Sequence, residues 1–98
     1  MDIEKKQDES KLFIKVSGRL DTQTSPQLEE CVKGKLDGIT ELKIDMADLE
    51  YISSAGLRVL LMISKIMKNQ GSFVICNINE TVKEVFDVTG FSDILTVE

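Results

Sequence analysis

Two adjacent serines and a glycine, Ser53, Ser54 and Gly56, interrupt an otherwise apolar stretch over residues 49–61. A serine at a helix start can accept hydrogen bonds from the unpaired backbone N–H groups of the first turn. If such a serine is phosphorylated, its dianion lies where those N–H groups and the helix dipole favour negative charge. The spacing therefore indicates two alternatives, an ordinary helix cap or a phosphorylation switch, and does not choose between them.

The residues needed for common catalytic schemes are missing from the chain. It contains no histidine, and neither a GxxxxGK phosphate loop nor a GxGxxG dinucleotide loop occurs. Nucleophilic and hydride-transfer mechanisms therefore lack their parts. A carboxylate pair such as Asp45 and Asp48 is still conceivable, but loop aspartates usually serve as caps or turn residues. The sequence predicts a protein that is not an enzyme and has no cofactor.

Charge and length limit the remaining function classes. The 98 residues suffice for one domain, covering residues 1–98, and the net charge of −5 argues against a nucleic-acid partner. The longest apolar run, residues 59–63, is far too short to insert in a membrane, and residues 1–11 do not resemble a secretory signal. We therefore expect a cytoplasmic protein. In that setting Cys31 and Cys76 are expected to be reduced, mostly buried thiols rather than a disulfide or a metal site.

Hydropathy patterns predict the elements of the first half of the chain. Period-two alternation predicts a strand over residues 11–17, with a weaker strand at 3–6 before it. A helix is expected to begin near residues 24–26, with Ser25 as its cap and Pro26 in the first position. A second alternating strand follows at 41–46, ending at Asp45 and Met46, and residues 47–52 are expected to form a loop.

The second half of the chain begins with a helix from residue 54 or 55 to residue 69. Its apolar residues form two stripes, and the second (Val59, Met62, Ile63 and Ile66) is either buried or covered by a partner, as in a weak dimer. The apolar run 72–76 is typical of a parallel strand covered on both faces. A helix over 80–88 capped by Asn79 and an edge strand near 94–97 complete an α/β fold: a mixed β-sheet with about three helices packed against it.

Four short motifs, in order, carry a resemblance to a known family. They are Gly18-x-Leu20-Asp21 after a strand, Asp45 in the next strand, Ser54-x-Gly56-Leu57 at a helix start, and the late pair Gly90-Phe91. With this order and spacing, the chain resembles the bacterial anti-sigma factor antagonists, whose fold is the STAS domain, over nearly its whole length.

The resemblance implies a partner-switching function. Members of this family bind, when unphosphorylated, a serine kinase of the GHKL type that is also an anti-sigma factor. That kinase phosphorylates a serine or threonine before the second helix, and a PP2C-type phosphatase reverses the modification. Carried over by motif, the phosphorylated residue is Ser54. The preceding position is often aspartate in the family, whereas this chain has Ser53, which therefore becomes a rival site.

Further residues near this motif are expected to contact the partner, each with a plainer alternative. Phosphate on Ser54 could bind the free N–H groups near Gly56 and Leu57. Gly56 would permit close approach of a kinase or would serve local packing. Arg58 would steer a partner or the phosphate, or would be solvated. Asp21 and Asp45 are expected near one sheet edge as partner contacts, or as turn-stabilising residues.

Two other functions are compatible with the same fold. Free-standing domains of this type also serve as accessory subunits of lipid transporters or signalling complexes, and such a subunit need not be phosphorylated. A nucleotide-sensing or scaffolding domain is a third interpretation. The net charge favours a monomer, and the second apolar stripe allows a weak dimer.

Overall fold

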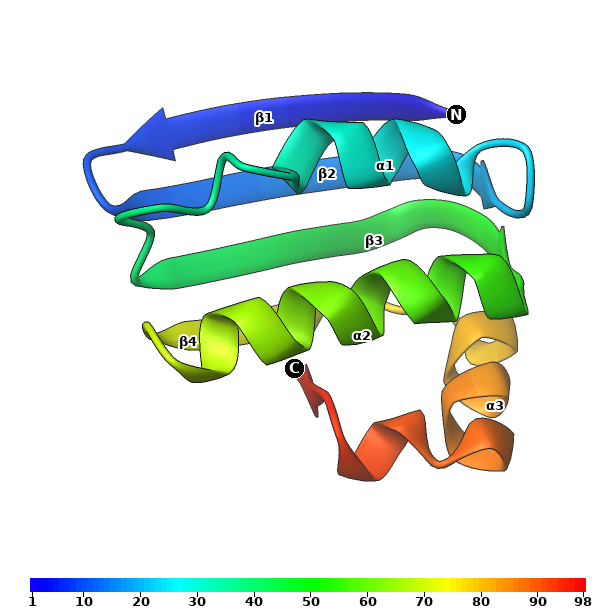
Figure 1. Ribbon diagram of the computed structural model, residues 1–98. Helices are drawn as coiled ribbons and strands as arrows, with labels where there is room; N and C mark the ends of the chain where they lie inside the picture. Colours follow the sequence, from blue (N-terminus) through cyan, green and yellow to red (C-terminus); the bar gives the residue numbers. More distant parts are fainter.

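A mixed five-stranded sheet organises the protein in the computed structural model, which describes residues 1–98. The strands lie side by side in chain order (Figure 1). The β1–β2 pair is antiparallel, and β3, β4 and β5 extend the sheet in parallel. Their bounds are β1 (Asp2–Asp8), β2 (Lys11–Leu20), β3 (Glu41–Ile52), β4 (Ser72–Cys76) and β5 (Thr96–Val97).

Each parallel connection contains one helix, and α1 and α2 cover the same face of the sheet (Figure 1). Because the parallel strands follow one another in one direction, right-handed crossovers place successive helices on one side. The helices are α1 (Ser25–Val32), α2 (Ser54–Lys68) and α3 (Glu80–Thr89), and a short 3-10 turn, η1 (Phe91–Asp93), follows α3. The predicted α/β fold with three main helices is confirmed. No helix is long and apolar enough to cross a membrane.

The core lies between the sheet and these helices. Alternate residues of β2 and β3, such as Ile14 and Ile44, are fully buried, and 22 buried residues form one apolar cluster. The other face of the sheet carries no helix and presents charged residues, with Phe13 partly exposed among them. The prediction that β4 is covered on both faces is therefore wrong, since its Val74 is only half-buried and lies on the open face.

The strand β3 continues through residues 47–52, where the sequence predicted a loop. Two register shifts in its pairing with β2 explain the error. Between the pairs Lys15–Asp45 and Ser17–Asp48, β3 contains one more residue than β2, and a second extra residue follows before Arg19 pairs with Tyr51. Such bulges break the period-two alternation that marks a strand in sequence.

The N-terminal end of α1 also differs from the prediction. The N-cap is Thr24, and Ser25 is the first helical residue, with its buried hydroxyl donating back to the carbonyl of Asp21. Pro26 is therefore the second residue of the helix and not the first, although it still lies in the first turn. The helix ends at Val32, because the backbone becomes extended at Lys33.

The last elements agree closely with the prediction. Asn79 caps α3, since its Oδ1 accepts a hydrogen bond from the N–H of Val82 at 2.8 Å, and Gly90 ends the helix with a φ of 81°. The edge strand is shorter than expected, because residues 94 and 95 form a turn after η1 and only Thr96–Val97 pair with β4. Cys31 is half-buried and Cys76 is buried; both are free thiols, and burial raises the pKa of Cys76.

The second apolar stripe of α2 was expected to be either buried or covered by a partner, and its four residues are not all in the same environment. Val59 and Ile63 belong to the core, whereas Met62 is half-buried and Ile66 is 36% exposed. Burial thus accounts for half of the stripe, and the outward half lies on the same helix as Ser54.

Candidate functional site

The start of α2 is fixed by the ends of two strands. Ser53 follows β3 directly as the N-cap residue, and its N–H donates to the carbonyl of Leu20 at the end of β2, 2.9 Å away. Its own carbonyl accepts the first helical hydrogen bond, from Leu57, at 3.0 Å. The N–H of Leu57 is therefore not free, contrary to the prediction. The unpaired donors of this turn belong to residues 54–56.

The two serines differ sharply in accessibility. The Oγ atom of Ser53 is buried and has no hydrogen-bond partner, and the side chain does not cap the helix. Ser54 is the first helical residue and is exposed. Neither hydroxyl therefore caps the helix, although capping was the plainer alternative for this motif.

Gly56 is buried at the contact between α2 and the ends of β2 and β3. A Cβ atom at this position would lie 2.8 Å from Cγ1 of Ile52 and 2.8 Å from Cγ of Leu20. Such distances are much shorter than ordinary carbon contacts. The structure therefore gives Gly56 the packing role that was one of its two alternatives.

Asp21 organises the loop between β2 and α1. Its Oδ1 accepts hydrogen bonds from the N–H groups of Gln23 and Thr24 at 3.0 and 3.1 Å, and from the hydroxyl of Thr24 at 3.2 Å. The N–H of Thr24, followed by that of Gln23, lowers the pKa of Asp21 below its ordinary value. Asp21 thus has the turn-stabilising role, and part of its carboxylate is still solvent-accessible.

A stacked pair, Arg19 and Tyr51, lies beside this loop and was missed by the sequence analysis. The guanidinium carbon of Arg19 is 4.5 Å from the ring centroid of Tyr51, and its Nε is 3.8 Å from Oδ2 of Asp21. The strand register places these residues opposite each other. Only the bulges in β3 bring Tyr51 into this pairing, so no local sequence signal could have revealed it.

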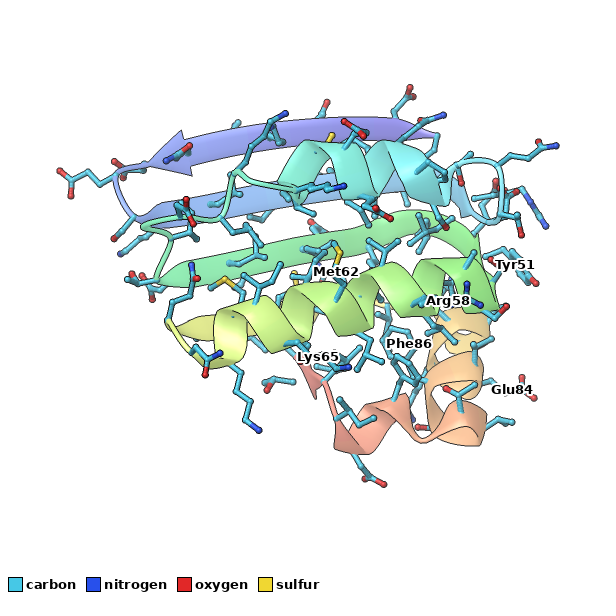
Figure 2. The ribbon with its side chains drawn as sticks, in the orientation of Figure 1. Tyr51, Arg58, Met62, Lys65, Glu84 and Phe86 are labelled. Carbon is cyan, nitrogen blue, oxygen red and sulfur yellow. The ribbon has the colours of Figure 1, made fainter.

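Arg58 lies one helical turn after Ser54 on the same side of α2, because residues four apart share a helix face. It is exposed and forms no ion pair. Figure 2 shows Arg58 on the N-terminal half of α2, at the end of the molecule that carries Tyr51. Ser54, Arg58, Arg19, Tyr51 and Asp21 are therefore grouped at one end of the sheet, and we call them the switch surface.

Asp45 does not belong to this group, and the expectation that it lies near Asp21 is wrong. It pairs with Lys15 in the middle of the sheet, whereas Ile52 at the end of β3 pairs with Leu20, five residues further along β2, which corresponds to about 17 Å at ~3.3 Å per residue. Its Oδ1 accepts hydrogen bonds from the N–H of Ala47 at 2.9 Å and from Nδ2 of Asn77 at 3.2 Å.

Asp48 is likewise bound in a structural contact. Its carboxylate lies 3.2 Å from Nζ of Lys15, and this hydrogen-bonded ion pair raises the pKa of Lys15. No group of three acidic, cysteine or histidine side chains has the geometry of a metal site.

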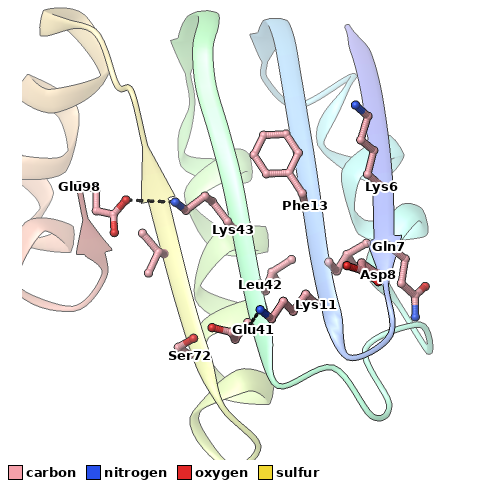
Figure 3. A pocket seen from close by; sticks show the side chains of 12 residues that line it. Lys6, Gln7, Asp8, Lys11, Phe13, Glu41, Leu42, Lys43, Ser72 and Glu98 are labelled. Carbon is pink, nitrogen blue, oxygen red and sulfur yellow. Dashed lines mark ion pairs between the residues drawn. The ribbon is translucent and has the colours of Figure 1, made fainter.

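The largest concavity, about 780 Å³, lies on the open face of the sheet (Figure 3). Its cations are mostly neutralised locally: Lys11 pairs with Glu41 at 3.5 Å, and Lys43 pairs with Glu98 at 3.2 Å. Phe13, at 36% exposure, is its main apolar surface. This mixture of paired charges selects no class of ligand.

Comparison with known proteins agrees with this architecture. The family model of the STAS domain matches residues 2–98. The chain belongs to the STAS domain family. Among curated relatives, the STAS domain is 36% identical to a protein of Bordetella bronchiseptica named for an anti-sigma factor antagonist, BtrV, over 88% of this chain and 76% of that one. It is 30% identical to the anti-sigma-B factor antagonist of Bacillus subtilis, over 99% and 90% of the two chains.

Solved structures show the same fold at low sequence identity. A crystal structure of a protein from Thermotoga maritima, titled as an anti-sigma factor antagonist, superposes with a TM-score of 0.88 at 20% identity, covering 97% of this chain and 84% of that one. The antagonist SpoIIAA in its unphosphorylated form gives a TM-score of 0.78 at 16% identity, with 99% and 87% coverage. SpoIIAA of Bacillus in its phosphorylated form gives 0.77 at 16% identity, with 99% and 91% coverage. The STAS fold is therefore shared across these proteins.

Proposed function

We propose that this STAS domain is an anti-sigma factor antagonist that acts by phosphorylation-controlled partner switching, with Ser54 as the modified residue. The carrying observation is the contrast between the two serines, since Ser54 is exposed on the first turn of α2 and the Oγ of Ser53 is buried. A kinase must reach the hydroxyl it modifies, so accessibility favours Ser54 over Ser53. The relatives named as anti-sigma factor antagonists support the functional class.

The switch works by changing a surface while the fold is kept. Phosphate adds about −1.5 to −2 charges and three acceptor oxygens. The unpaired N–H groups of residues 54–56 and the helix dipole favour that charge at this position. Because Ser54 makes no side-chain contact on which the fold depends, the modified protein is expected to stay folded.

The partner protein responds to the charge of the phosphate on Ser54. In our proposal the unphosphorylated switch surface binds a serine kinase of the GHKL type that also serves as anti-sigma factor, and a PP2C-type phosphatase restores binding. A partner packed flush against Ser54 would have to desolvate the phosphate dianion, which costs on the order of several kcal/mol. Arg58 and the exposed edge of Asp21 are the charged contacts offered to that partner. The domain acts in the cytoplasm as substrate and ligand, and not as an enzyme.

The decisive experiment is a pull-down from the native cell extract with four baits: wild type, Ser54→Ala, Ser54→Asp and Ser53→Ala. The recovered wild-type protein is analysed by phosphosite mass spectrometry. We expect wild type, Ser54→Ala and Ser53→Ala to retain a kinase and Ser54→Asp to lose it, with phosphate on Ser54. Circular dichroism of all four baits checks that the fold is intact.

Two results would contradict the proposal. Phosphate on Ser53, with loss of kinase binding by a Ser53→Asp variant, would reassign the switch to the rival residue. Recovery of the same membrane transporter subunits by every bait, with neither serine phosphorylated, would indicate an accessory subunit instead.

A further inference from the structure

A second concavity, of about 460 Å³, lies between α2 and the C-terminal segment formed by η1 and β5. Its floor is apolar: Leu61 and Phe73 are half-buried, Leu95 is buried, and Ile94 is 53% exposed. In Figure 1 the C-terminal segment lies below α2, and β5 rises toward that helix. We call this concavity the α2–β5 groove. An isoleucine more than half exposed beside a groove of this kind offers unused apolar surface for a partner.

The rim of the α2–β5 groove is basic. Lys65 and Lys68 line it one helical turn apart, both are exposed, and neither forms an ion pair. No aspartate or glutamate lines the groove, and α2 contains no acidic residue at all. The chain has a net charge of −5, so a groove lined by two unpaired lysines and no acidic residue is more positively charged than the molecule as a whole.

The larger concavity on the open face of the sheet offers no such selectivity. There Lys11 and Lys43 are each held by a glutamate, and the carboxylate of Asp8 also lines the surface. A ligand would have to break existing ion pairs in that concavity. In the α2–β5 groove the cations are free, so a carboxylate partner gains contacts without displacing others.

We propose that the α2–β5 groove docks an acidic amphipathic helix of another protein. Apolar side chains of that helix contact Ile94 and Phe73, and carboxylates on its flank face Lys65 and Lys68. The two lysines are three residues apart on one helix, which matches carboxylates three or four residues apart on a second helix lying alongside. Two cations fall short of the four to eight that lipid-binding basic clusters contain, and the net negative charge opposes an anionic bilayer.

This docking site is separate from the switch surface. Lys65 is 11 residues beyond Ser54 along α2, which corresponds to about 16 Å at ~1.5 Å per residue. The proposal therefore does not depend on phosphorylation. A single partner could engage both sites, in which case the α2–β5 groove would hold it while the switch surface senses its release.

The test uses a synthetic helical peptide with leucines on one face and glutamates flanking them, labelled with fluorescein, and the intact protein. Fluorescence anisotropy is expected to show saturable binding that weakens in about 0.5 M salt. A Lys65→Gln/Lys68→Gln double variant and an Ile94→Ser variant are each expected to bind about three- to tenfold more weakly. Binding by Ser54→Asp is expected to equal that of wild type, which separates this proposal from the phosphorylation switch.

Matched controls come from exposed residues outside the α2–β5 groove. Lys33→Gln/Lys35→Gln removes the same charge after α1, and Val88→Ser removes a comparable apolar side chain from α3, where Val88 is 80% exposed. Equal losses in these controls, or no saturable binding by wild type, would overturn the proposal. Saturable binding of phosphatidylglycerol vesicles without binding of the peptide would also overturn it, in favour of a lipid surface.

Discussion

Replacing Gly56 by alanine tests how α2 is held against the sheet. The added Cβ would lie 2.8 Å from Cγ of Leu20 and from Cγ1 of Ile52, and 3.0 Å from Cδ2 of Leu20. Leu20 and Ile52 are 0% and 1% exposed. The contacted Cγ atoms are close to the backbone of each strand, so they cannot swing away as the end of a flexible side chain can. The helix start must therefore shift away from the sheet to accommodate the methyl group.

The expected change in the free energy of unfolding follows from two opposing contributions. Overpacking in a core typically costs about 1–3 kcal/mol. Alanine in place of glycine recovers about 0.8–1.0 kcal/mol of helix propensity. Since both neighbours are fully buried, we expect the cost in the upper part of its range and a net loss of about 1–2 kcal/mol in the free energy of unfolding. For a chain of this size that corresponds to a fall of at least about 4 °C in the melting temperature.

The assay is urea unfolding followed by far-ultraviolet circular dichroism at neutral pH. Lys65→Ala, at an exposed position of the same helix, is the control and is expected to lie within about 0.5 kcal/mol of wild type. In a Leu20→Ala background the cost of Gly56→Ala is expected to fall, because one of the two clashing side chains is gone while that of Ile52 remains. A Gly56→Ala variant as stable as wild type, yet unable to bind its partner, would refute the packing argument and support a role of Gly56 in partner approach.

Three further predictions concern loops and caps. Gly71→Ala is expected to destabilise the protein more than Gly56→Ala, because its Cβ would lie 1.9 Å from the carbonyl oxygen of Thr40 and a backbone atom cannot move aside. Its unfolding free energy is measured by the same urea assay. Asn79→Ala removes the cap of α3, and also the 2.7 Å hydrogen bond from Nδ2 to the carbonyl of Leu49; hydrogen exchange in α3 should report a loss of about 1 kcal/mol. Asp21→Asn keeps an acceptor oxygen but removes the charge, so it is expected to lower the urea midpoint at neutral pH. Because the pKa of Asp21 in the folded protein lies below its ordinary value of 3.8, the charge contributes stability above that value. The difference from wild type should then shrink as the pH falls below about 4.

Each of these predictions has a control or a contrary result. Asn69→Ala, at the exposed C-cap of α2, should leave hydrogen exchange in α3 unchanged. Asp37→Asn, which removes an exposed carboxylate without side-chain hydrogen bonds, should not reproduce the pH dependence of Asp21→Asn. A Gly71→Ala variant with wild-type stability would show that the loop before β4 can move away from Thr40.

The fold was largely predictable because most elements carry a strong local pattern. The run of residues 72–76 and the cap at Asn79 define their elements by themselves, and α2 is amphipathic over 15 residues, so its length is readable from its periodicity. The predicted end of β3 failed because the two bulges opposite β2 destroy the alternation. Ser25 was misassigned because serine is favoured both as a cap and as a donor to a nearby carbonyl, and sequence cannot tell these apart.

The sequence by itself determined the family, the α/β class and the position of the serine motif at a helix start. Those properties follow from the order of residues along the chain, which carries periodicity, capping chemistry and motif spacing. The tertiary structure decided which hydroxyl is exposed, that Gly56 packs against Leu20 and Ile52, and that Arg19 stacks on Tyr51. It also decided that Asp45 lies far from Asp21. Each of these depends on strand register and on contacts between segments distant in the chain, and those are set by the packing of the whole core rather than by local residue preferences.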